Sequence, residues 1–177
     1  CTTKPHPVTG KEVPDESARI PLFDFTNPRR AEWPKADYIV GNPPFIGGWK
    51  MREALGSGYV EALWNIYDLP EKADFVMYWW AKAADLAAAE KIERFGFITT
   101  NSITQVFQRR IIEKAFAKTS LAFAIADHPW IDAADGAAVR IAMTVGQKGT
   151  AAGILGSITD ERFDHGAEEA GVVIEYR

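Results

Sequence analysis

The stretch that decides the predicted fold is residues 38–48, Tyr38-Ile39-Val40-Gly41-Asn42-Pro43-Pro44-Phe45-Ile46-Gly47-Gly48. The apolar run at its start predicts the end of a buried strand. The strand must stop after it, because proline has no N–H to donate to a sheet and because Pro43 disfavours a helical backbone at Asn42. The stretch therefore predicts a stiff loop at the carboxyl end of a strand, where open α/β sheets bind their ligands.

The loop carries groups that can hold an amino group on a flat ring. Asn42 offers a side-chain carbonyl, and Pro43 and Pro44 offer backbone carbonyls with no N–H of their own. Two such acceptors can bind both hydrogens of an NH₂ group, while Phe45 supplies a face on which a planar ring can stack. Holding both hydrogens favours the tetrahedral nitrogen that nucleophilic attack requires, so the stabilisation grows toward the transition state. The loop suits alkylation of an amino group on a planar base.

The composition predicts a soluble domain with a core of its own. The chain has 177 residues, a net charge of −4 and one cysteine. A single cysteine fits a reducing compartment, and the sequence shows neither a signal peptide nor a long apolar run, so we expect a cytoplasmic protein without membrane spans. Scattered His and Cys residues predict no metal site. The basic residues are also scattered. If the protein binds DNA, we therefore expect most of the phosphate contacts to come from other parts of the polypeptide.

Apolar, β-prone runs alternate with segments of helical periodicity along the chain. We expect strands near residues 20–25, 37–40, 95–99, 121–126, 138–145, 154–158 and 172–176, and helices over residues 49–55, 59–67, 71–91 and 103–116. In the longest helix the predicted core stripe is Phe75, Trp79, Ala83, Leu86 and Ala87. This order predicts an α/β protein with a mostly parallel sheet covered by helices.

The sequence divides into three parts. Residues 1–34 form an irregular segment that leads into the core, and residues 35–150 form the catalytic region. Residues 151–177 hold C-terminal strands or the start of a following domain. The chain begins with Cys rather than Met, from which we expect a piece of a longer polypeptide.

Several motifs together resemble one family. Asn-Pro-Pro-Phe after an apolar strand resembles the catalytic motif of S-adenosylmethionine-dependent amino-methyltransferases, especially the DNA adenine-N6 methyltransferases. Asp74-Phe75 at a helix start and Thr99-Thr100-Asn101-Ser102 after a strand match further features of this family. The segments Ala126–Ile131 and Asp135–Ile141 are similar to those of large single-chain bacterial restriction–modification enzymes. The match covers most of the chain, from about residue 27 to residue 145.

The resemblance implies a Rossmann-like class I methyltransferase sheet, of which this chain holds the catalytic half. It implies methyl transfer from S-adenosylmethionine to N6 of an adenine that is flipped out of double-stranded DNA, in a restriction–modification system. The candidate catalytic residues are Asn42, Pro43, Pro44 and Phe45. Asn42 and the carbonyl of one proline, by resemblance Pro44, hold the amine, and Phe45 stacks on the base.

Three further residues receive candidate roles. Trp130 is a candidate second stacking face, because we expect it in a short loop between two strands, although a core tryptophan under that loop is an equal alternative. Asp74 and Phe75 border the cofactor by resemblance only. Helix capping and core packing explain these two residues equally well.

Two features of the family are absent from the sequence. The cofactor loop, with the pattern aromatic-x-Gly-x-Gly, does not occur, and we expect it upstream of Cys1. A target-recognition domain is expected after about residue 150, in the same full-length polypeptide, and whether a nuclease domain is attached stays open. We therefore expect the isolated fragment to be inactive.

Other functions stay open at this stage. The same loop could methylate the side-chain amide of a protein glutamine or an amino group in RNA. Cytosine N4 is a further acceptor, although enzymes of that type usually have Ser in place of Asn42. The chain could also be a non-catalytic interaction module in which the loop is only a turn.

Overall fold

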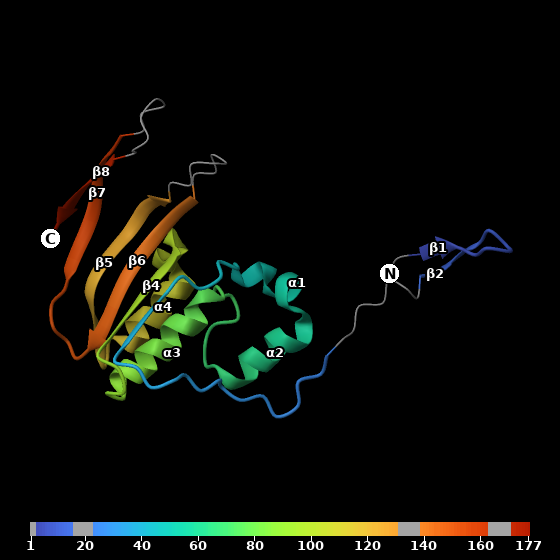
Figure 1. Ribbon diagram of the computed structural model, residues 1–177, viewed down its shortest axis with the longest axis horizontal. Helices are drawn as coiled ribbons and strands as arrows, with labels where there is room; N and C mark the ends of the chain where they lie inside the picture. The colour runs from blue at the N-terminus through green and yellow to red at the C-terminus, as the bar shows by residue number, and fades with distance from the viewer. Residues whose placement is uncertain (1–2, 16–22, 131–138, 163–170) are drawn as a thin grey trace.

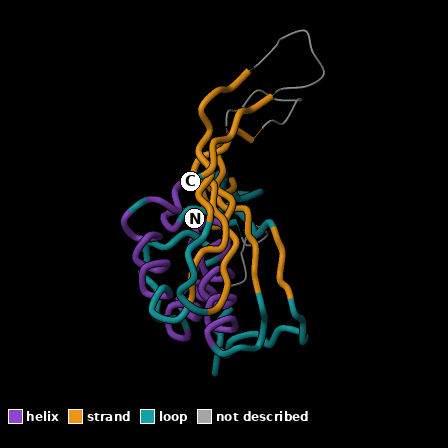
Figure 2. Tube along the Cα trace, turned by 90° about the vertical axis from the view of Figure 1, so that its left-hand side faces the viewer, coloured by secondary structure: helices purple, strands orange, loops and turns teal. Residues whose placement is uncertain are grey.

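The computed structural model describes residues 3–15, 23–130, 139–162 and 171–177 (Figure 1). A short antiparallel hairpin, β1 (Thr3–Pro5) and β2 (Glu12–Pro14), lies at the N-terminal end. The other described strands form one six-stranded sheet, and helices pack against it (Figure 2). The α/β class predicted from the sequence is confirmed. No helix in these ranges is long and apolar enough to cross a membrane.

The sheet is mixed, with the strand order β3-β4-β6-β5-β7-β8. Its strands are β3 (Tyr38–Gly41), β4 (Arg94–Thr100), β5 (Thr119–Trp130), β6 (Val139–Lys148), β7 (Ile154–Arg162) and β8 (Gly171–Tyr176). β3 runs parallel to β4 and β5 runs parallel to β7, while the other neighbours are antiparallel. Four of the six strands, β3, β4, β5 and β7, therefore point in the same direction, as the sequence predicted, whereas β6 and β8 run the opposite way and make the sheet mixed. β6 is reversed because its connection to β5 is too short for the crossover that a parallel pair requires.

One expected strand is not observed in the part that can be described. Residues 20–22 of the expected edge strand lie outside the described residues, and residues 23–25 form no strand. Instead, the Phe25 ring packs edge-on against Tyr59, with 5.7 Å between the ring centroids. The segment therefore lies against a helix and not along the sheet.

Three of the four helices that the sequence pattern predicts begin later in the structure, and the second begins two residues earlier. The helices are α1 (Met51–Leu55), α2 (Ser57–Ile66), α3 (Val76–Ala88) and α4 (Val106–Ala115), with 3₁₀ turns η2 (Gly48–Lys50) and η3 (Asn101–Thr104). α3 was expected over residues 71–91. It starts after Asp74 because that carboxylate binds two loops, and it ends before Glu90, which has a positive φ of 56°.

The core lies between α3 and the central strands of the sheet. Trp80 is 1% exposed, and its ring packs edge-on against Phe95 of β4 with 5.3 Å between the centroids. The Trp80 indole N–H donates to the Thr144 hydroxyl of β6 at 3.1 Å. Of the predicted stripe, Phe75, Ala83 and Ala87 are buried, whereas Trp79 and Leu86 are only partly buried. The buried face is therefore shifted by one residue, from Trp79 to Trp80.

Gly146 provides a test of this packing, because a Cβ atom there would lie 2.2 Å from the Phe95 ring. We expect Gly146→Ala to lower the free energy of unfolding by about 1–3 kcal/mol, since the ring has to move within a packed core. Gly96 lies in the neighbouring strand, and a Cβ there would meet no atom closer than 3.7 Å. Gly96→Ala should therefore stay within about 1 kcal/mol of the unsubstituted chain in urea unfolding. An equal decrease in the free energy of unfolding in both variants would contradict the packing of Phe95 against Gly146.

Candidate functional site

The carboxyl ends of β3 and β4 define the candidate site. The two strands are parallel neighbours and end at Gly41 and Thr100, so the loops that follow them leave the sheet side by side. A cavity of about 350 Å³ lies between these loops. Phe45 and Gly47 line it from the loop after β3, Ser102 and Gln105 line it after β4, and Asp74 joins them from the segment before α3.

The Asn42–Phe45 loop presents the groups that the sequence predicted. The Asn42 side chain is exposed and makes no hydrogen bond to any described part of the chain. The Pro44 carbonyl accepts the Ile46 N–H at 3.1 Å, which leaves one of its two lone pairs free. Pro43 is buried, and the Phe45 ring is 39% exposed beside the cavity. An amide oxygen, a carbonyl oxygen and an aromatic face are thus all carried by one short loop.

A second cavity, of about 480 Å³, is lined by the first part of the same loop. Asn42, Pro43 and Pro44 line it together with two tryptophans, Trp33 and Trp79. The Lys82 ammonium holds the Trp33 segment in place, because it donates to the Ala31 carbonyl and lies 4.3 Å from the centroid of the Trp33 ring. Burial lowers the pKa of Lys82 below its usual value. The loop therefore borders two cavities, one through Asn42, Pro43 and Pro44 and the other through Phe45.

Asp74 joins the two loops of the site. One carboxylate oxygen accepts the Gly48 N–H at 2.9 Å, and the other accepts the Ser102 hydroxyl at 2.6 Å. The next residue, Phe75, donates its N–H to the Ile46 carbonyl at 2.8 Å. Bonds to an ionised carboxylate are stronger than those between neutral groups. The loop after β3 is thus fastened to the segment before α3 and, through Ser102, to the loop after β4.

The two residues assigned to the cofactor lie in different surroundings. Asp74 lines the cavity, while Phe75 is buried and packs edge-on against Trp79 with 4.5 Å between the ring centroids. Phe75 also packs near Tyr59 and Tyr78. Contact of Asp74 and Phe75 with a cofactor stays a prediction.

Trp130 lies in a strand and not in the loop that we expected. It is the last residue of β5 and pairs with Val139 of β6. The pairing with β6 shifts register between Ile125 and His128 and is then unbroken to Trp130, so the connection begins only after Trp130. Ile131 and residues 135–138 of the resembling segment lie outside the described residues. Trp130 is 40% exposed at the same edge as the loop, but β6 and β4 separate it from β3. Three strand spacings amount to about 14 Å, so the structure does not bring Trp130 beside Phe45, and its stacking role stays a prediction.

Two groups of residues at this edge were missed in the sequence. The Lys72 ammonium lies 4.6 Å from the centroid of the Trp49 ring and 5.3 Å from that of Phe107. Asp127 of β5 accepts hydrogen bonds from Asn101 at 3.3 Å and from Arg140. In both groups the members are far apart in the chain, so only the fold reveals them. In the part of the chain that can be described, no cluster of His, Cys, Asp or Glu could hold a metal ion.

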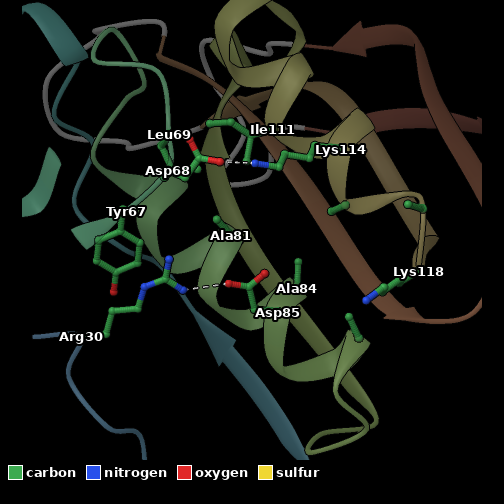
Figure 3. Close-up of a pocket in the computed structure, with 13 residues that line it drawn as sticks. Arg30, Tyr67, Asp68, Leu69, Ala81, Ala84, Asp85, Ile111, Lys114 and Lys118 are labelled. Carbon is green, nitrogen blue, oxygen red and sulfur yellow. Dashed lines mark hydrogen bonds and ion pairs between the residues drawn. The ribbon is translucent and has the colours of Figure 1, made fainter. Parts of the chain in front are cut away.

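A further cavity, of about 340 Å³, lies on α3 and α4 (Figure 3). Four of its charged groups form two ion pairs: Arg30 with Asp85 at 3.0 Å, and Lys114 with Asp68 at 2.5 Å. The bond from Lys114 lowers the pKa of the Asp68 carboxyl, and burial raises the pKa of the neighbouring Tyr67. None of its lining residues belongs to the loops after β3 and β4, so we do not assign it to the site.

Comparisons with known proteins agree on one relationship. The family model described as MmeI, DNA-methyltransferase domain matches residues 7–155. The chain is similar to a solved structure of the Type IIL restriction-modification enzyme MmeI in complex with DNA, with a TM-score of 0.55 and 27% sequence identity. This match covers 77% of the chain but only 18% of the MmeI chain, so the chain spans less than a fifth of that enzyme.

A second solved structure is a modification subunit of a putative type I restriction enzyme from Vibrio vulnificus YJ016. It matches with a TM-score of 0.48 and 15% identity over 75% of this chain and 27% of that one. No curated protein sequence matches the chain.

Gly48 tests how firmly the loop after β3 is fastened. A Cβ atom at Gly48 would lie 2.5 Å from the Lys72 carbonyl oxygen, whereas one at Gly47 would meet nothing closer than 3.8 Å. We expect Gly48→Ala to displace the turn and break the bond to Asp74, so that the amide of residue 48 exchanges with solvent about tenfold faster. Gly47→Ala should leave that amide protected. Hydrogen exchange followed by NMR measures both, and unchanged protection in Gly48→Ala would contradict the fastening.

Proposed function

The chain belongs to the MmeI DNA-methyltransferase domain family, and from this premise we propose that it carries out the methyl transfer of a restriction–modification enzyme. The proposed methyl donor is S-adenosylmethionine, and the proposed acceptor is adenine N6 in double-stranded DNA. The observation that carries this proposal is the Asn42–Phe45 loop, whose amide side chain has no partner in the described chain and whose aromatic ring borders a cavity.

We assign the amine to two acceptors on this loop. The Asn42 side-chain oxygen and the free lone pair of the Pro44 carbonyl would each accept one hydrogen of the amino group. This arrangement directs the nitrogen lone pair away from the ring system and stabilises the positive charge that develops on nitrogen as the new N–C bond forms. The nitrogen attacks before it loses its proton, so the step requires no general base among the neighbouring residues.

The cavity of about 350 Å³ is our candidate site for the ring of the base, whereas the two acceptors of its amine, Asn42 and Pro44, line the second cavity. The first cavity has a volume at the lower end of the range for small-molecule sites, and Phe45 lines it as a stacking face. An adenine inside a duplex cannot reach such a cavity, so the proposal requires that the target nucleotide is flipped out of the helix. The MmeI structure that this chain resembles is a complex with DNA, which favours DNA over RNA or protein as substrate. Asn42, where cytosine-N4 enzymes usually have Ser, favours adenine.

The second cavity fits only part of the proposed cofactor. When bound, S-adenosylmethionine supplies an electrophilic methyl group on a positively charged sulfur. Trp33, Trp79 and Pro43 give the cavity beside Asn42 apolar walls, but no carboxylate lines it to hold ribose hydroxyls. We therefore propose that further cofactor contacts, DNA target recognition and any nuclease activity belong to other parts of the full-length protein. Residues 35–150 would form the catalytic region within it.

The full-length protein provides the direct test. We would incubate it with labelled S-adenosylmethionine and DNA, digest the DNA to nucleosides, and compare the wild type with Asn42→Ala. The wild type should produce N6-methyladenine, and Asn42→Ala should lower the rate roughly 100-fold or more, as expected for losing one acceptor at a developing charge. The matched control is Asn65→Ala, since Asn65 is an exposed asparagine of α2 away from the loop. It should keep the wild-type rate.

Each other outcome of this experiment identifies a different function. Label on cytosine N4 would replace the acceptor, and label in RNA or protein would replace the substrate. Transfer that persists at the wild-type rate in Asn42→Ala would remove the loop from the mechanism. If no methyl group is transferred to any acceptor, the better interpretation is a non-catalytic interaction module.

A separate prediction concerns the isolated 177-residue chain. We expect it to form no N6-methyladenine under conditions in which the full-length protein does, because the described residues give the cofactor cavity only apolar walls near Asn42. Binding of labelled S-adenosylmethionine to the isolated chain, measured by equilibrium dialysis, should be correspondingly weak. Methylation of DNA by the purified chain would show this prediction to be wrong.

A further inference from the structure

Three residues from separate segments form a cation–aromatic cluster at the edge of the site. Trp49 belongs to η2, Lys72 precedes α3, and Phe107 lies in the first turn of α4. The Lys72 ammonium lies 4.6 Å from the centroid of the Trp49 ring and 5.3 Å from that of the Phe107 ring. These distances are within the range of cation–π attraction for both rings.

The backbone fixes the relative positions of Trp49 and Lys72. Gly48 lies so close to the Lys72 carbonyl that a Cβ atom would approach it to 2.5 Å, and the Gly48 N–H is bound to Asp74 at 2.9 Å. The turn that carries Trp49 is therefore packed against the turn that carries Lys72. The folded backbone therefore keeps Trp49 and Lys72 next to each other.

The cluster is open to solvent and its cation has no acidic partner. The Trp49 side chain is 80% exposed and the Phe107 side chain is 37% exposed. No carboxylate in the described ranges forms an ion pair with Lys72, and Lys50 adds a second exposed cation in the same turn. Large exposed aromatic groups beside unpaired cations are more typical of binding surfaces than of the general protein surface.

The cluster adjoins the cavity assigned to the base. Gly47 and Gln105 line that cavity, and Trp49 and Phe107 each follow two residues later in the chain. A nucleotide strand that places one base against Phe45 would have its neighbouring phosphate and base close to this cluster. Phosphate and bases match the chemistry of the cluster, because ammonium groups bind phosphate and aromatic rings stack on bases.

We propose that Trp49, Lys72 and Phe107 form the surface that holds the DNA strand next to the flipped nucleotide. Lys72 binds a phosphate beside the target, and the exposed face of Trp49 stacks on an adjacent base, with Phe107 keeping the ammonium in position. This inference rests on the proposed function, since it takes duplex DNA as the substrate.

DNA binding by the full-length protein tests the inference. The probe is a fluorescein-labelled duplex that contains a sequence methylated by the wild type, and Kd is measured by anisotropy over a range of salt concentrations. Lys72→Gln should weaken binding several-fold at low salt and reduce the slope of log K against log salt by about one. Trp49→Ala should weaken binding roughly tenfold and leave that slope unchanged.

Matched controls come from the opposite end of α4. Phe116 is 40% exposed, close to the 37% of Phe107, and it follows the last residue of the same helix. Phe116→Ala and Lys118→Gln should keep the wild-type Kd and slope, whereas Phe107→Ala should weaken binding. Equal effects of Phe107→Ala and Phe116→Ala would overturn the assignment of Phe107.

The outcomes separate this inference from the proposed function. Wild-type affinity in both Trp49→Ala and Lys72→Gln, with normal N6-methyladenine formation, would overturn the inference and leave the function intact. A lower melting temperature in Trp49→Ala with unchanged Kd would show that another part of the protein covers the cluster, and would also overturn it. Asn42→Ala should lower the transfer rate roughly 100-fold or more but keep the wild-type Kd for DNA, so it can be told apart from Trp49→Ala and Lys72→Gln, which weaken binding.

Discussion

The carboxylate of Asp74 is the interaction on which the candidate site depends. It accepts the Gly48 N–H with one oxygen and the Ser102 hydroxyl with the other, so it joins loops that come from two different strands. Without it, the loop after β3 would be held to the segment before α3 by the bond between the Ile46 carbonyl and the Phe75 N–H. Both oxygens of an ionised carboxylate are used, which makes Asp74 a strong and directional connection.

The packing of α3 on the sheet fixes the position of Asp74 and therefore of the two loops that it joins. Trp80 packs against Phe95 of β4 and bonds to Thr144 of β6, so α3 has a fixed position relative to the strands that carry the site. Asp74 lies just before the helix, so the packing of α3 also fixes the position of Asp74. The loops are consequently placed by a buried core and not by their own flexible backbone.

The sequence predicted the parts of the fold that depend on local chemistry. The prolines of the loop, the apolar strands and the approximate helices could be recognised because each is encoded in neighbouring residues. The start of α3 could not, since it depends on the bonds of Asp74 to Gly48 and Ser102, which are distant in the chain. Helical periodicity also fits a stripe through Trp79 nearly as well as one through Trp80. The position of Trp130 depends on its pairing with Val139, and no local pattern indicates where that strand ends.

The two cavities that the loop borders are compatible with the proposed direct transfer of a methyl group. A methyl group that passes from one large molecule to another requires the donor and the acceptor to approach the same point from opposite sides. Phe45 faces one cavity and Asn42 lines the other, with only Pro43 and Pro44 between them. Pro43 and Pro44 line the second cavity and connect Asn42 to Phe45, so in the proposed function they would keep the amine and the stacking ring at a fixed separation.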